Sequence, residues 1–229
     1  MNFKNIFFLL ILLLSFQACL AQTSETRSFS SFDKIDFKGA AKVFLTEGNK
    51  EEAKISAENL DLSDVITEVK NNTLYISMKK DKNYNNTKLT INLTYKKLEK
   101  IQVGGAIDLQ SNSVIKSDKF QLKCSGAGNV SLKVDTRELA VDCSGASNLE
   151  MTGKTDYQTI ELSGAGNFKG YGLQSNTSKV EVSGVGNVEL NVQKELVANL
   201  SGMGNISYKG NPATKKINKS GFGSISSKN

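Results

Sequence analysis

The sequence contains no histidine and no tryptophan, and it has one proline among 229 residues. Without histidine the chain cannot form a Ser-His-Asp or Cys-His catalytic arrangement, nor an imidazole metal site. Few aromatic residues and little arginine argue against nucleic-acid binding, because single strands stack on aromatic side chains. The formal net charge of +6 comes from lysines spread along the chain and indicates solubility. We therefore expect no nucleic-acid partner and no cofactor.

The first 21 residues are expected to form a signal peptide rather than part of the fold. Lys4 precedes the apolar run from Ile6 to Leu14, which is too short to span a bilayer but suits a signal-peptide core. Two ways of processing remain open: cleavage by signal peptidase after Ala21, or lipid attachment at Cys19, which ends a loose lipobox. Either way of processing predicts a secreted protein or a protein of the cell envelope (outer-membrane lipoprotein, periplasm or cell surface). We expect membrane contact only through a lipid at Cys19.

A short motif, Ser-Gly-Ala-Gly-Asn with small variations, recurs along the second half of the chain. Its first glycine falls at intervals of 21, 19, 19, 20, 18 and 19 residues, and the residues between the copies alternate Val, Ile and Leu with polar side chains. A fixed period near twenty with this β patterning predicts a solenoid, in which each coil buries its apolar face against the next. The glycines are Gly105, Gly126, Gly145, Gly164, Gly184, Gly202 and Gly221.

Positions aligned on that glycine form columns of like residues. The columns four before, two before, one after and four after the glycine are apolar with one exception, Lys219, whereas the position three before it is polar in every copy. This alternation predicts that one face of each coil is buried and takes in all four apolar columns. The fold class that follows is all-β: a parallel β-helix of coils of about 19–20 residues, preceded by a less regular β-rich half.

We interpret the recurring motif as a corner between strands. Glycine suits a sharp turn where φ becomes positive, and coils stacked about 4.8 Å apart bring the asparagines into a hydrogen-bonded turn ladder. A phosphate-binding loop would need a third glycine and a following helix, and a calcium repeat would need aspartate where apolar residues stand. We therefore expect no metal at the corner. The ladder consists of Asn129, Asn148, Asn167, Asn187 and Asn205.

These motifs resemble the bacterial auto-transporter adhesin family with a GIN head domain, an exported domain of unknown function. The resemblance covers nearly all of the mature chain: the segments Phe29–Gly39, Val43–Gly48 and Asn72–Ile76, and then the glycine-asparagine coils. It implies a right-handed β-helix, an exported or lipid-anchored protein and an adhesive role. It carries over no catalytic residues.

The mature chain reads as one body with two halves. Residues 22–100 are β-rich but lie outside the twenty-residue register, residues 101–229 hold the coils, and no Gly/Ser/Pro linker separates them. The polar stretch Lys79–Thr87 is expected to be a loop. The last coil should be a polar cap that prevents end-to-end strand pairing, and stacking into a homo-oligomer through this end is the alternative. The lysines of the cap are Lys215, Lys216, Lys219 and Lys228.

Two cysteines stand in the core column two before the glycine, one coil apart. We expect Cys124 and Cys143 to be buried free thiols. Their Cα atoms, about 4.8 Å apart, would lie inside the disulfide window of roughly 4.4–6.8 Å, so a bridge formed after export is the alternative.

An acidic ladder is expected on the outward face, where Asp142, Glu161 and Glu181 stand three before the glycine on consecutive coils. Carboxylates about 5 Å apart match the separation in retaining glycosidases, roughly 5–5.5 Å, and could also ligate a divalent cation. Catalysis, however, needs two acids in different surroundings, and a flat solvated face gives all three the same ones. We prefer a solvated face and keep the ladder as a candidate ligand-binding site.

Three functions from different classes fit these observations. The leading hypothesis is a non-catalytic envelope module that presents a rigid β-helical surface to a glycan or to an envelope or host protein. The second is a structural envelope protein that assembles with copies of itself. The third is a carbohydrate-active enzyme, since polysaccharide-degrading enzymes also use β-helices, and fold alone does not separate the three.

Overall fold

The computed structural model describes residues 23–228, and nearly all of them lie in strands. The predicted signal peptide and the predicted lipid attachment at Cys19 lie outside the described residues. Within residues 23–228, no helix is long and apolar enough to cross a membrane. The elements are β1 (Thr23–Ser28), β2 (Lys34–Glu47), β3 (Glu52–Glu58), η1 (Leu62–Asp64), β4 (Val65–Lys70), β5 (Thr73–Met78), β6 (Lys88–Tyr95), β7 (Lys100–Cys124), β8 (Ala127–Cys143), β9 (Ala146–Leu162), β10 (Asn167–Val182), β11 (Val185–Leu200), β12 (Met203–Lys209), β13 (Thr214–Lys219) and β14 (Phe222–Ser227).

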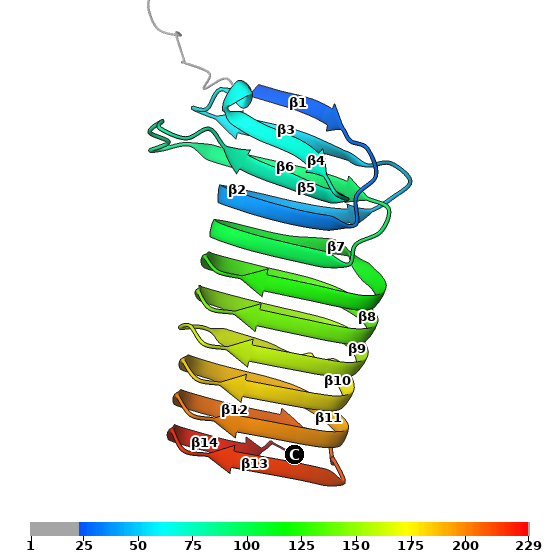
Figure 1. Ribbon diagram of the computed structural model, residues 1–229, viewed down its shortest axis with the longest axis vertical. Helices are drawn as coiled ribbons and strands as arrows, with labels where there is room; N and C mark the ends of the chain where they lie inside the picture. The colour runs from blue at the N-terminus through cyan, green and yellow to red at the C-terminus, as the bar shows by residue number, and fades with distance from the viewer. Residues whose placement is uncertain (1–22, 229) are drawn as a thin grey trace, which may run out of the picture.

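Strands β7 to β14 form a parallel β-solenoid, which confirms the predicted fold class. Each long strand runs through one coil and pairs in parallel with the strands of the coils before and after it. The register follows the motif, because Ala127 lies beside Ala146 and Asn129 beside Asn148. Figure 1 shows the coils stacked along one axis, with β13 and β14 at the far end from β1.

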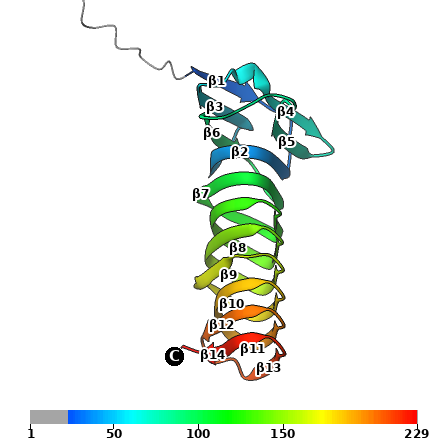
Figure 2. The same cartoon turned by 90° about the vertical axis from the view of Figure 1, so that its left-hand side faces the viewer.

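The N-terminal half continues the same sheet. Strand β2 lies parallel to β7 with Gly39 opposite Gly105, so it forms the first rung of the stack although it precedes β7 by more than fifty residues. Strand β6 pairs with the second part of β2, and β3 and β1 then extend the sheet as antiparallel strands. The β4–β5 hairpin pairs with the first part of β2 along the same edge, which is the edge opposite β7, and so lies across the solenoid from β6 (Figure 2). The antiparallel strands close this end of the solenoid.

The core is a set of inward columns that runs the length of the stack. The columns four before, two before and four after the motif glycine are buried from the first rung to β12, as the alternation predicts. The column one after the glycine is different: its alanines are exposed, and Val185, Met203 and Phe222 expose 50%, 54% and 81% of their surface. The expectation that this column is buried was wrong, because an odd offset from the inward columns places it on the outer face of a strand.

The corner glycines are required by close approach between coils. A Cβ added to the first glycine of each motif from Gly126 onward would lie 1.9–2.0 Å from the carbonyl oxygen of the corresponding glycine on the coil before. None of these six glycines has φ in the left-handed region, so the expected positive φ is wrong for them. The second glycine has positive φ only in some copies, such as Gly128 and Gly204.

The last coil ends the core with lysine. Strand β13 pairs with β11 so that Lys215, Ile217 and Lys219 continue the inward columns of Leu196, Ala198 and Leu200, which are fully buried. All six residues of β13 are exposed. The Lys219 ammonium donates a hydrogen bond to the Gly223 carbonyl at 2.9 Å. Charged residues on inward positions of an edge strand oppose pairing with another strand, so the last coil has the features of a cap.

Candidate functional site

The outward face of β7, β8, β9 and β10 carries three parallel rows of side chains, all of them polar except Ala140. The rows are two residues apart along each strand, and neighbouring members of a row lie on adjacent rungs. The first row is Lys119, Glu138, Tyr157 and Thr177, the second is Gln121, Ala140, Thr159 and Lys179, and the third is Lys123, Asp142, Glu161 and Glu181.

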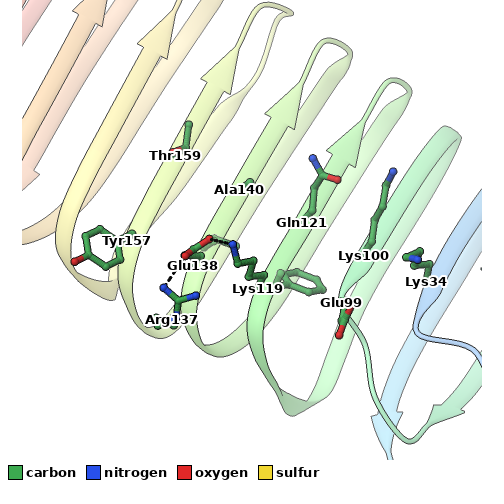
Figure 3. A pocket seen from close by; sticks show the side chains of 12 residues that line it. Lys34, Glu99, Lys100, Lys119, Gln121, Arg137, Glu138, Ala140, Tyr157 and Thr159 are labelled. Carbon is green, nitrogen blue, oxygen red and sulfur yellow. Dashed lines mark ion pairs between the residues drawn. The ribbon is translucent and has the colours of Figure 1, made fainter.

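A groove of about 700 Å³ lies over the first two rows. It is hollowed at Ala140, whose methyl group stands between the longer side chains of Gln121 and Thr159. Figure 3 shows Tyr157 at one end of the groove and Lys34 and Lys100 at the other. Tyr157 exposes 54% of its surface. An exposed aromatic ring beside hydrogen-bonding side chains on rigid strands is suited to holding a polar ligand.

Ion pairs hold the charged wall of the groove in place. Arg137 donates two hydrogen bonds to Asp118, at 2.7 and 3.0 Å, and pairs with Glu138 at 2.6 Å. Lys119 pairs with Glu138 from the adjacent rung at 2.9 Å (Figure 3). The hydrogen bonds from Arg137 lower the pKa of Asp118, and the bond from Lys119 lowers the pKa of Glu138. Both carboxyl groups are therefore ionised at neutral pH.

The structure places the three acidic candidates on adjacent rungs but outside the groove. Asp142 lies beside Glu161, and Glu161 beside Glu181, in the third row. Lys123 lies next along the row and pairs with Asp142 at 3.5 Å. Among residues 23–228, no group of three or more acidic or cysteine side chains is arranged to hold a metal ion. The three carboxylates on this open strand face therefore remain candidates for contact with a ligand.

The asparagine ladder runs down the corner as a chain of side-chain hydrogen bonds. Asn167 donates to Asn148 at 2.9 Å and accepts from the backbone and side chain of Asn187 at 3.1 and 3.2 Å. The chain begins at Asn129, continues through Asn205 and ends at Ser224, which donates to Asn205 at 2.7 Å. These amides are used to join coils, so we keep the prediction that the ladder is structural.

The comparisons with known proteins concern this same body. Residues 31–212 match the family model described as "Putative auto-transporter adhesin, head GIN domain". The chain belongs to this family. The description of the family points to a role in binding at a surface rather than to a particular ligand. The match includes every residue of the groove and of the acidic ladder.

Three solved structures are similar to this adhesin-family chain. A putative adhesin from Bacteroides fragilis NCTC 9343 is 25% identical, with a TM-score of 0.86 over 90% of this chain and 97% of that one. A putative adhesin from Parabacteroides distasonis ATCC 8503 is 20% identical, with a TM-score of 0.71 over 90% and 97%. A protein named as a putative lipid binding protein from the same organism is 22% identical, with a TM-score of 0.71 over 91% and 97%. No curated protein matches the chain.

The groove was not anticipated from the sequence, although a signal for it exists. Lys119, Glu138 and Tyr157 all stand seven residues before a motif glycine, and Gln121, Ala140 and Thr159 stand five before it. Extending the column alignment to five and seven residues before the glycine would have placed these side chains in outward rows. Arg137 does not belong to these columns, but it is one of only two arginines in the chain.

Proposed function

We propose that this member of the adhesin family is a non-catalytic binding module of the cell envelope, and that it holds a glycan chain in the groove over Ala140. The observation that carries the proposal is the exposed ring of Tyr157 beside a hollow flanked by Gln121 and Thr159. A sugar offers a C–H face that packs on an aromatic ring and hydroxyl groups that pair with polar side chains. The rigid stack keeps these side chains at fixed separations, which lowers the entropy cost of binding.

The charges of the groove support binding rather than cleavage. A glycosidase needs one carboxyl group whose raised pKa keeps it protonated. In the groove, the pKa of Glu138 is lowered by the hydrogen bond from Lys119, and Glu138 is engaged by Arg137 as well. These contacts favour a permanently ionised Glu138, which fixes the positions of Lys119 and Arg137 but cannot donate a proton near neutral pH.

The proposal is tested with the mature chain, residues 22–229, on an array of immobilised polysaccharides and oligosaccharides. We expect retention of at least one glycan with no release of shorter products, and loss of that retention in Tyr157→Ala. Phe222→Ala is the matched control, because Phe222 is also an exposed aromatic residue (81%) but lies on β14, at the opposite end of the solenoid from Lys34 (Figure 1). Retention that survives Tyr157→Ala, or cleavage of the glycan, would contradict the proposal. Binding confined to proteins on a parallel array would replace the glycan with a protein ligand.

A further inference from the structure

A second surface lies at the opposite end of the solenoid from β1, and the groove does not use it. Two rows meet there: the exposed apolar column of the corner and the lysines of the last coil. Along the corner the side chains lengthen from alanine to Val185, Met203 and Phe222 on successive rungs. Phe222 is the most exposed large apolar residue of the described chain, at 81%. Large apolar groups left in water on a surface commonly mark an interaction site.

The last part of the chain, residues 196–229, carries charge of one sign. Residues 196–229 contain five lysines and no aspartate or glutamate, whereas acidic residues are spread through the chain up to Glu195. Beside Val185 and Met203 the corner carries only serine and asparagine side chains. Ile217 is 44% exposed on β13, between Lys215 and Lys219. Glu195 of β11 lies beside Thr214, and Glu189 lines a pocket with Lys228, so the positive charge is partly balanced from the rung before. The tip therefore combines exposed apolar side chains with an excess of positive charge. The five lysines are Lys209, Lys215, Lys216, Lys219 and Lys228.

We propose that this C-terminal tip docks on the surface of an anionic phospholipid bilayer, with Phe222 and Met203 inserted at the level of the headgroups and the lysines paired with lipid phosphates. Basic residues near an anionic bilayer attract it, and aromatic and aliphatic side chains inserted at the interface add apolar burial. Lysine suits this place because its aliphatic stem can cover apolar surface while its ammonium group stays among the headgroups.

The geometry favours a bilayer over a second copy of the chain. A strand that paired with β13 would bury Lys215 and Lys219 inside a continuous core, and burying an unpaired ammonium group is strongly unfavourable. Such a strand would also leave the corner column uncovered, because Phe222 points outward from the corner and not along the stack. A broad surface, such as a bilayer, can contact the lysines of β13 and the exposed apolar side chains of the corner at the same time.

The depth of docking is limited by the backbone. The outer edges of β13 and β14 face the end of the stack, and open strand edges are not tolerated in the hydrocarbon region. The strands therefore stay among the headgroups, and only side chains such as Phe222 reach the acyl chains. Docking should accordingly be reversible and weakened by salt.

The absence of tryptophan allows a direct test. In the mature chain, Phe222→Trp provides a single fluorophore at the tip, and Tyr157→Trp provides the matched control in the groove. With vesicles of phosphatidylcholine and phosphatidylglycerol, we expect a blue shift and quenching by brominated acyl chains for the tip reporter, and neither for the groove reporter. Vesicles of phosphatidylcholine alone should give no shift. A tip reporter that stays in water, or two reporters that respond alike, would overturn the proposal.

Sedimentation with the same vesicles provides the second measurement. We expect Phe222→Ser to bind about tenfold more weakly than the unaltered chain, as removal of an inserted aromatic side chain implies. Lys215→Gln with Lys216→Gln should weaken binding and reduce its dependence on salt. Equal binding by Phe222→Ser and the unaltered chain would refute docking by the tip. Self-association that Phe222→Ser abolishes, without vesicle binding, would assign the tip to a second copy instead.

Discussion

Cys124 and Cys143 lie directly opposite each other on adjacent rungs, both 2% exposed and both free thiols. The hydrogen bond between the two thiols raises the pKa of Cys124 and lowers that of Cys143. They fill one inward column with Leu162, Val182 and Leu200, all buried. The two side chains therefore fill space in the core, although their position on adjacent rungs would also bring the two sulfur atoms close enough to form a disulfide.

The first prediction is that this pair stays reduced in the mature protein. Parallel side chains on stacked strands hold the Cβ atoms wider than the roughly 3.8 Å that a disulfide prefers, so a bridge would be strained. Without reductant, we expect both thiols to be alkylated in the denatured protein and neither to react quickly in the native one. A mass lower by two hydrogens, with no alkylation after denaturation, would show that the bridge forms.

The second prediction concerns the corner glycines. Gly164→Ala should destabilise the protein by about 1–3 kcal/mol or more, because the new methyl group would lie 2.0 Å from the Gly145 carbonyl oxygen and the coils must separate. Gly104→Ala is the matched control, since its Cβ would make an ordinary contact of 3.4 Å with Ser125. Chemical denaturation compares the two. Equal losses of stability would mean that spacing between coils does not dictate the glycine.

The third prediction concerns the asparagine ladder. Asn167→Leu removes the bonds to Asn148 and Asn187 and should cost about 1–3 kcal/mol, while glycan retention by the folded protein stays unchanged. Asn92→Leu, an exposed asparagine on β6, is the control and should melt like the unaltered chain. If Asn167→Leu melted normally but lost retention, the corner would be a binding site.

How far the sequence predicts this molecule depends on which residues repeat. The inward columns were predictable because burial imposes apolar residues at a fixed offset from the glycine on every coil. The alanine column misled because alanine is compatible with either face, and strand parity places it outside. The groove depends on Ala140, a single short side chain within a row of longer ones. Aligning the repeats reveals what the coils share, so a single deviating residue carries no signal in that alignment. Arg137 contacts Asp118 across a rung, a pairing that only the register reveals.

The fourth prediction concerns the pH range over which the ion pairs beside the groove persist. Hydrogen bonds from Arg137 lower the pKa of Asp118, so its contribution to folding is present above the ordinary pKa near 4 and is lost as the pH falls through the lowered value. The wall of the groove should therefore remain intact down to about pH 4. An NMR titration of the Asp118 carboxyl group measures this pKa, and Arg137→Gln should move it upward. An Asp118 pKa that Arg137→Gln leaves unchanged would disprove the pairing in solution.

The last prediction concerns the acidic ladder. Asp142, Glu161 and Glu181 share one open strand face and therefore the same solvated surroundings, whereas catalysis by two acids needs two different environments. Solvent and salt screen their mutual repulsion, and Lys123 compensates Asp142. We expect Glu161→Gln to fold and to retain a glycan as the unaltered chain does, measured by melting and by array binding. Lys123→Gln is the companion variant, which should likewise change little, because an exposed ion pair contributes about 0–1 kcal/mol.

Loss of retention in Glu161→Gln without loss of stability would extend the binding site from the groove to the third row. Glycan cleavage that disappears in this variant would instead identify Glu161 as a catalytic residue, and the binding module would then be an enzyme.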